Sequence, residues 1–241
     1  MPTLYVVATP IGNLSDMSPR AIETLRSVQL IAAEDTRVTM KLLNAFDIST
    51  PLTSCHEHNE RSKAVQIAER MLAENIDVAV TTDAGTPCIS DPGSVLVREA
   101  TERGIPAVAV SGPTAMASAL SVSGMDISEF TFYGFLPRQK NELREKLTDM
   151  ARHSKIAVVH ESPHRVIELL QQVQAVLPHT FVSASCDLTK KFEQTLRGPV
   201  EQVLRLLEEN PKADKGEYCL CLRWAEEDIP APETVREDIS L

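Results

Sequence analysis

Aromatic residues and positive charge are both scarce in this chain of 241 residues. Three Tyr, six Phe and one Trp give no indication of an aromatic surface on which nucleic-acid bases could stack. Lys and Arg number 24 against 34 Asp and Glu, and the formal net charge of -10 argues against a protein that coats nucleic acid by bulk electrostatic attraction. Any contact with nucleic acid must therefore use a local basic patch.

Disulfides, secretion signals and membrane spans are not indicated either. The five cysteines are scattered and odd in number, which predicts reduced thiols and a cytoplasmic location, and they form no CxxC zinc knuckle. The longest apolar runs have the length of strands, and residues 1–4 lack the basic region and apolar stretch that begin a signal peptide. With 43% hydrophobic residues, the composition predicts a soluble protein with enough apolar surface for domain cores.

In the first half of the chain, short apolar runs alternate with segments of helical periodicity. Residues 4–8 are typical of a buried strand, and residues 19–28 place their apolar side chains on one helical face. The same alternation predicts strands at 29–33, 76–81 and 105–110 and helices at 39–46, 59–74 and 93–103. Uninterrupted apolar strands separated by helices predict an α/β fold with a mostly parallel sheet covered on both faces.

A stretch of small residues at 111–124 separates this series from a second one. The second series predicts strands at 130–135, 156–160, 181–185 and 217–224 and helices at 141–152, 163–177 and 200–209. We therefore expect two α/β domains, at 1–112 and 113–224. An irregular tail at 225–241, with six acidic residues and one Arg, is expected to follow them.

Three loops leave the predicted strands of the first half at the sheet edge where ligands bind in parallel α/β folds. The loop at 82–93 is the richest: Asp83 directly follows a buried strand, and Asp91 with Pro92 is typical of a helix N-cap and first helical residue. Asp83 could hold an amino or hydroxyl group of a ligand, or form an Asx turn. The loops at 9–13 and 111–115 would border the same crevice, and no loop carries a dinucleotide or nucleotide-phosphate fingerprint.

The charged motif at 34–37 follows the second predicted strand. Asp35 could cap the next helix. Alternatively, Arg37 binds a phosphate while a carboxylate orients or deprotonates an acceptor hydroxyl. His56 and His58 have the alternate spacing of one strand face, but no third ligand is evident and we expect no metal there.

Residues 160–164 spell HExxH, the zinc-peptidase signature. That motif requires both histidines on one helix, whereas residues 156–159 predict a strand and Ser162 with Pro163 predicts the start of a helix. We therefore expect no zinc and interpret this string as another loop between a strand and a helix.

Two basic clusters are the expected phosphate contacts of this acidic chain, although the first could equally be a solvated helix face. The clusters are Arg138, Lys140, Arg144 and Lys146, and Lys190, Lys191 and Arg197, with Arg37 and Arg165 in addition.

Several of these blocks together resemble the bacterial ribosomal small-subunit methyltransferase I family, over residues 4–224. They are LYVVATPIGNL at 4–14, AEDTR at 33–37, HNE at 58–60, DAGTP at 83–87, GFLP at 134–137 and ESPHR at 161–165. The resemblance implies S-adenosylmethionine-dependent 2′-O-methylation of a cytidine in 16S rRNA at the decoding centre. It also implies a homodimer with the two-domain, tetrapyrrole-methylase-like fold of class III methyltransferases, each domain a sheet flanked by helices.

The resemblance further implies which residues act. The donor-binding positions would be Pro10, Asp83, Thr86, Thr114 and Ala115, with His160 and Leu188 from the second domain. The EDTR and HNE blocks are not shared with porphyrin-methylating relatives, so Asp35 as base or orienter and Arg37 as phosphate ligand are assigned to the RNA side. Further RNA contacts are expected from His58, Asn59, Arg138, Lys140, Arg165 and Lys190, within the 30S subunit.

Two other functions fit the same pattern less well. A tetrapyrrole C-methyltransferase would share the donor site but needs a Gly-rich first loop of the GxGPGD kind, whereas residues 8–13 read ATPIGN. A non-catalytic RNA-binding assembly factor would bind the donor without releasing its methyl group. Many members of the family continue into a helical C-terminal extension, and we expect its absence here to affect the grip on the ribosome.

Overall fold

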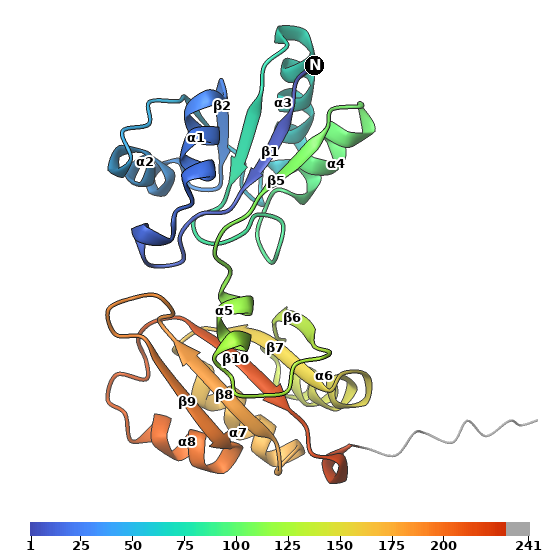
Figure 1. Ribbon diagram of the computed structural model, residues 1–241. Coiled ribbons are helices and arrows are strands. Elements are labelled where there is room, and N and C mark those ends of the chain that lie inside the picture. The colour runs from blue at the N-terminus through green and yellow to red at the C-terminus, as the bar shows by residue number, and fades with distance from the viewer. Residues whose placement is uncertain (230–241) are drawn as a thin grey trace, which may run out of the picture. The chain divides into compact units, whose positions relative to one another are not determined.

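The computed structural model describes residues 1–229, which divide into two compact units, the first at Met1–Ala115 and the second beginning at Met116. Figure 1 shows that each unit is built on its own sheet. Among the described residues, no helix combines the length and the apolar character needed to cross a membrane.

The sheet of the first unit is wholly parallel, with the strand order β3-β2-β4-β1-β5. Its strands are β1 (Leu4–Val7), β2 (Leu30–Ala33), β3 (Leu52–Ser54), β4 (Val78–Thr81) and β5 (Ala107–Val110). The helices are α1 (Pro19–Ser27), α2 (Thr36–Ala45), α3 (Glu60–Glu74) and α4 (Ser94–Glu102). Because β4 lies between β1 and β2, the loops that follow these three strands leave the same edge of the sheet side by side.

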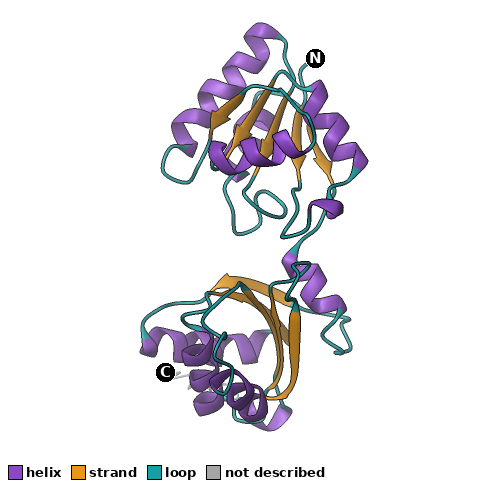
Figure 2. Ribbon diagram, turned by 90° about the vertical axis from the view of Figure 1, so that its left-hand side faces the viewer, coloured by secondary structure: helices purple, strands orange, loops and turns teal. Residues whose placement is uncertain are grey.

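Buried strands with helices on both sides account for the apolar runs of the first unit. Strands β2 and β4 are buried along their whole length. Ile31 and Ala79 enter a core with α1 and α2, whereas Leu30 and Val80 enter a second core with α3 and α4. Figure 2 shows helices on both faces of this sheet, which confirms the predicted α/β architecture.

The second unit has a mixed sheet in the order β6-β7-β10-β8-β9. Its strands are β6 (Thr131–Phe135), β7 (Ile156–Glu161), β8 (Phe181–Cys186), β9 (Gln194–Pro199) and β10 (Tyr218–Arg223). Strands β6 and β7 are parallel, and the other neighbours are antiparallel. Helices α6 (Lys140–His153), α7 (Val166–Val176) and α8 (Val200–Glu208) bury their apolar stripes in one core with this sheet (Figures 1 and 2).

Two strands and one α-helix of the described residues were not predicted from the sequence. Edge strand β3 has only three residues and is half-buried, and edge strand β9 is largely exposed and polar, so neither contains an apolar run. The stretch of small residues at 111–124 contains a short helix, α5 (Ala115–Ser121).

Three predicted helix starts were wrong. Helix α2 begins at Thr36, three residues before the predicted start at 39. Helix α4 begins at Ser94 with Gly93 at its N-cap, and not with Asp91 as cap and Pro92 as first residue. Helix α7 begins at Val166, because the backbone N–H groups of Arg165 and Val166 both donate to the Ser162 carbonyl and form a turn there.

The expectation of an irregular tail was also wrong for residues 226–228. Glu226–Asp228 form a 3₁₀ turn, and the Asp228 carboxylate accepts hydrogen bonds from the His179 backbone N–H at 2.7 Å and from its ring at 2.8 Å. The rest of the expected tail, 230–241, lies outside the described residues.

Candidate functional site

The loops after β1, β4 and β5 are joined to one another at the carboxyl edge of the first sheet. Thr9 and Gly85 exchange backbone hydrogen bonds of 2.8 and 3.0 Å, and the Thr86 hydroxyl lies 3.5 Å from the Pro113 carbonyl. Gly85 has φ of +83°, a conformation that favours glycine. Pro10, Asp83, Thr86, Thr114 and Ala115, all predicted donor-binding residues, therefore belong to one connected group of loops.

Two carboxylates join the loops after β2 and β4. The Asp83 backbone N–H donates to Glu34 Oε2 at 3.2 Å, and the Asp35 backbone N–H donates to Asp83 Oδ1 at 3.1 Å. Burial is the main cause that raises the pKa of Glu34 and of Asp83. Burial, with the charges of Glu34 and Asp83, raises the pKa of Asp91 to about 6. Glu34 and Asp91 are partly buried and Asp83 is exposed, and this concentration of negative charge favours a cationic group of a ligand.

Asp35 combines the two roles that the sequence left open. Its Oδ1 caps α2 by accepting from the Arg37 backbone N–H at 2.8 Å. The same carboxylate accepts from Arg37 Nε at 3.0 Å and Nη2 at 2.6 Å. The hydrogen bonds from Arg37 hold the pKa of Asp35 well below its usual range, so the carboxylate is a weak proton acceptor. This geometry favours orientation of Arg37, whose side chain is 87% exposed, over proton abstraction.

A pocket of about 290 Å³ lies between the loop after β1 and helix α2. Pro10 and Asp83 line it together with Leu14 from the loop and with Val38 and Lys41 from α2. Lys41 was not selected from the sequence. The spacing could have identified Lys41, because it follows Arg37 by four residues and therefore lies on the same face of α2 one turn later.

Asn59 and Glu60 of the HNE block hold neighbouring loops in place, a role that the sequence did not indicate. The Asn59 side chain accepts from the His56 backbone N–H at 2.9 Å and donates to Ser54 Oγ at 3.4 Å. The Glu60 carboxylate is buried and accepts from the Gly93 and Val95 backbone N–H groups at 2.7 and 3.1 Å. Glu60, and not Asp91, therefore caps α4. His58 is exposed.

In the second unit, the two histidines of HExxH do not share a helix. His160 lies on β7 with its ring centroid 5.2 Å from that of Phe132 and 5.7 Å from that of Phe135. Burial lowers the pKa of His160, which keeps the ring neutral at pH 7. His164 lies in the turn before α7. In the described part of the chain, no group of three or more His, Cys, Asp or Glu is placed to hold a metal ion.

Two of the predicted RNA contacts, Arg165 and Lys190, are engaged by other side chains of the second unit. Arg165 Nη2 lies 3.4 Å from Oε2 of Glu161, whose side chain is 1% exposed, and donates to the Pro137 carbonyl at 3.1 Å. Lys190 Nζ donates to Asp187 at 3.0 Å and to Glu217 at 2.7 Å. Leu188, predicted to bind the donor, is buried in the same loop as Lys190.

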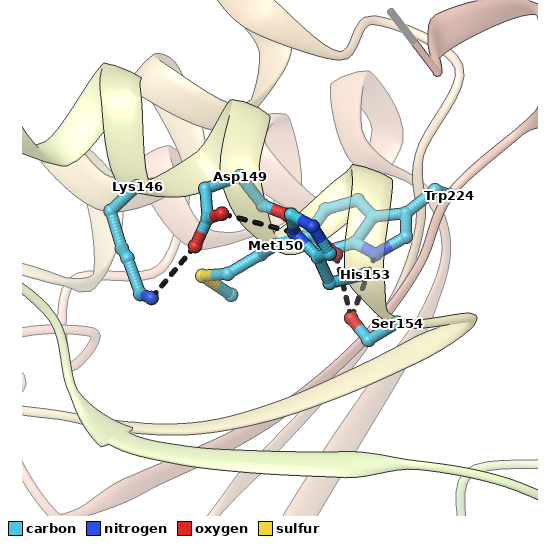
Figure 3. Close-up of polar contacts among 6 residues, drawn as sticks. All are labelled: Lys146, Asp149, Met150, His153, Ser154 and Trp224. Atoms are coloured by element: carbon cyan, nitrogen blue, oxygen red, sulfur yellow. Dashed lines mark hydrogen bonds and ion pairs between the residues drawn. The ribbon is translucent and has the colours of Figure 1, made fainter. Parts of the chain in front are cut away.

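The predicted basic cluster around α6 divides into free and engaged side chains. Figure 3 shows Lys146 paired with Asp149. Lys146 Nζ lies 2.9 Å from Asp149 Oδ2, and His153 Nδ1 lies 3.0 Å from Oδ1 of the same carboxylate. Arg144 donates to Gln172. Arg138 and Lys140 are exposed and have no ion-pair partner among residues 1–229. Figure 3 also shows the Trp224 indole N–H near Ser154 Oγ, at 3.5 Å, which fixes the end of β10 against α6.

Comparisons with known proteins agree with this architecture. Residues 3–204 match the family described as Tetrapyrrole (Corrin/Porphyrin) Methylases. The chain is 42% identical to "Ribosomal RNA small subunit methyltransferase I" of Halalkalibacterium halodurans, over 99% of this chain and 81% of that protein. It is 40% identical to the protein of the same name from Synechocystis, over 99% of this chain and 86% of that protein.

Solved structures at low identity show the same fold. Diphthine synthase gives a TM-score of 0.71 at 12% identity, covering 93% of this chain and 90% of that one. Uroporphyrin-III-C-methyltransferase from Thermus thermophilus gives 0.60 at 17% identity, covering 96% of this chain and 100% of that one.

Proposed function

Because the chain belongs to the tetrapyrrole methylase family and, within it, to the ribosomal RNA small subunit methyltransferase I proteins, we propose that it methylates the 2′-oxygen of a cytidine ribose in 16S rRNA. The methyl donor in this proposal is S-adenosylmethionine, and the acceptor lies at the decoding centre of the 30S subunit. The protein would act in the cytoplasm as a homodimer.

The observation that carries the proposal is the exposed Arg37 guanidinium, held by Asp35 at the edge where the strand-end loops meet. A guanidinium fixed by two hydrogen bonds keeps its remaining N–H groups in one orientation, which suits an RNA phosphate. The pocket beside it has apolar walls from Leu14 and Val38 and the cation of Lys41. These groups suit a nucleotide better than an uncharged small molecule.

The carboxylates of the same edge suit the donor. S-adenosylmethionine, when bound, supplies a methyl group on a cationic sulfonium. Glu34, Asp83 and Asp91 provide a concentration of negative charge that would stabilise a cation, and Asp83 lies in the loop that follows β4. We assign donor binding to Pro10, Asp83, Thr86, Thr114 and Ala115, and to His160 and Leu188 of the second unit.

The residues of the chain contribute chiefly alignment. In the reaction, the hydroxyl oxygen forms a bond to the methyl carbon as the carbon–sulfur bond breaks, and the hydroxyl proton leaves to a base or to water. Arg37 would fix the phosphate next to the acceptor ribose, and Asp35 would fix Arg37. Since the pKa of Asp35 is lowered, we assign it the role of a positioning residue and not of the base.

The exposure of each side chain divides the remaining predicted RNA contacts into direct and indirect ones. Arg138, Lys140 and His58 are exposed and would bind RNA directly. Arg165, Lys190 and Asn59 would act on RNA through the loops that they hold in place, since their side chains are engaged in those loops.

The test is transfer of a labelled methyl group from S-adenosylmethionine to unmethylated 30S subunits, with naked 16S rRNA and uroporphyrinogen as parallel acceptors. Label on a single cytidine ribose, found by mapping the modified nucleotide, is the expected result. Label on the tetrapyrrole alone would assign the protein to the sister activity. Donor binding without any transfer would support a non-catalytic assembly factor.

A further inference from the structure

Phe192 is the most exposed aromatic side chain among residues 1–229, at 75% relative accessibility. It lies in the loop that joins β8 to β9 in Figure 1. Exposing a large apolar ring to water is unfavourable. Single exposed apolar residues are nevertheless common on protein surfaces. The surroundings of Phe192 therefore decide whether its exposure has a function.

The loop that carries Phe192 is braced at several points. The Thr189 backbone N–H donates to Glu193 Oε2 at 2.6 Å, and the Asp187 backbone N–H donates to the Glu217 carbonyl at 3.0 Å. Lys190 connects the same loop to Asp187 and Glu217 through its ammonium group. Phe192 is thus presented by a fixed loop, which lowers the entropy lost when a ligand orders its side chain.

Two ammonium groups flank the Phe192 ring. Lys191 Nζ lies 5.5 Å from the ring centroid, and Lys212 Nζ, from the segment between α8 and β10, lies 5.9 Å from it. Within the described chain, neither lysine has an ion-pair partner. The two segments, 187–193 and 210–217, carry four acidic and four basic residues. Of the acidic residues, Glu193 accepts a backbone N–H, and Asp187 with Glu217 holds Lys190.

From this arrangement we infer that the Phe192 patch, made of Lys191, Phe192 and Lys212, binds a single-stranded segment of RNA. One base would stack on the ring, and the adjacent phosphates would contact the two lysines. The sequence predicted Lys191 as a phosphate contact but not Phe192 or Lys212, because the number of aromatic residues does not tell which of them are exposed. The inference rests on the proposed function only in taking RNA as the partner.

A second copy of the chain is a less suitable occupant. The cores of interfaces between subunits are depleted in lysine, because burying an ammonium group without a partner is costly. Here two ammonium groups lie 5.5 and 5.9 Å from the ring centroid. Single-stranded RNA supplies both an aromatic face and negative charge, so that the two lysines gain charge partners where a base stacks on the ring.

The experiment compares full-length Phe192→Leu and Phe192→Tyr proteins in binding a 12-nucleotide unstructured RNA and 30S subunits. Leucine keeps an apolar side chain but removes the π face, whereas tyrosine keeps it. Loss of one stacked base predicts about 5- to 150-fold weaker RNA binding for Phe192→Leu, with Phe192→Tyr close to the parent protein. In methyl transfer, KM for the RNA substrate should rise while kcat is unchanged.

Further variants test the charge of the patch and whether the effect depends on the position of the substituted residue. Lys191→Gln and Lys212→Gln should each lower the slope of log Kd against log salt by about 0.7, the value for one phosphate contact on a single strand. Phe130→Leu, at a 43% exposed aromatic of the same unit, and Lys155→Gln, at a lysine paired with Glu129, serve as matched controls and should bind RNA normally.

Four outcomes distinguish the inference from its alternatives. Parent-like RNA affinity in Phe192→Leu would overturn it, and so would a parent-like salt slope in both Lys191→Gln and Lys212→Gln. Unchanged RNA affinity with altered sedimentation would assign the patch to self-association and overturn it as well. RNA binding that depends on Phe192, in a protein that transfers no methyl group to RNA, would support this inference while refuting the proposed function.

Discussion

Replacing Glu60 tests whether a buried carboxylate on one helix holds the start of another. Glu60 is 8% exposed and accepts the backbone N–H groups of Gly93 and Val95 at the first turn of α4. Those N–H groups belong to the set that an α-helix leaves without internal partners. In Glu60→Ala, both would lie at a buried helix end without an acceptor.

The size of the effect follows from these two hydrogen bonds. A hydrogen bond to a charged group contributes about 1.5–3 kcal/mol, and loss of a helix cap costs about 0.5–2 kcal/mol. The value for the hydrogen bonds and the value for the cap describe the same contacts of Glu60 and are not added. We therefore expect Glu60→Ala to destabilise the first unit by about 2–4 kcal/mol. Glu60→Gln keeps an acceptor oxygen and should cost about 1 kcal/mol, the value of a neutral hydrogen bond.

Amide hydrogen exchange provides the assay. Peptides that contain Gly93 and Val95 should exchange faster in Glu60→Ala, and urea unfolding should give the overall loss of stability. Glu57→Ala is the matched control, because Glu57 is exposed three residues earlier and should leave both measurements unchanged. Parent-like protection of Gly93 and Val95 in Glu60→Ala would refute the assignment of Glu60 as the cap of α4.

Three further predictions concern charges. Arg37→Gln should reduce methyl transfer to RNA strongly while leaving S-adenosylmethionine affinity unchanged in calorimetry; weakened donor binding instead would argue against Arg37 as a phosphate ligand. Burial raises the pKa of Asp91 to about 6 in the folded protein. The folded state therefore holds the proton more tightly than the unfolded state, and stability falls as pH rises from 4 through 6. Asp91→Asn should be more stable than the parent in urea at pH 7 and show a smaller difference at pH 4; equal curves at both values would contradict this. Arg165→Met should destabilise the protein by about 3–5 kcal/mol, because it leaves the buried Glu161 carboxylate without its cation. Glu161→Gln in the same chain should restore part of the loss, and a purely additive double variant would show that the two side chains are not coupled.

Local sequence pattern predicted the central strands and the edge strands β5 and β6, and it missed the other two edge strands, β3 and β9. Strands β1 and β4 are continuous apolar runs enclosed by helices, so their sequences record their burial directly. Edge strands β3 and β9 have polar or half-exposed residues, and their pairing with the neighbouring strand does not appear in their own composition. Only the assembled sheet shows that they are strands.

The same limit applies to the polar residues of the site. The contact from Glu60 to α4 joins positions 33 residues apart, and local capping rules therefore selected Asp91 in its place. Lys190 was expected to contact RNA, and of the two carboxylates that bind it, Asp187 lies three residues away in the sequence but Glu217 lies 27 residues away. By contrast, the contact of Asp35 with Arg37 spans two residues, and the sequence did indicate both capping and phosphate binding there.

Each polar motif of the chain therefore combines residues that hold loops with residues left accessible, and exposure separates the two kinds. In EDTR, Glu34 and Asp83 join neighbouring loops, and Arg37 projects into solvent. In ESPHR, Glu161 is buried, the partly buried Arg165 contacts both Glu161 and the Pro137 carbonyl of another loop, and His164 is exposed. A substitution of an exposed cation should thus weaken RNA recognition in a fold of unchanged stability, whereas a substitution of a buried carboxylate should lower stability first. A stability measurement beside every activity measurement therefore separates a loss of recognition from a loss of the loop that presents it.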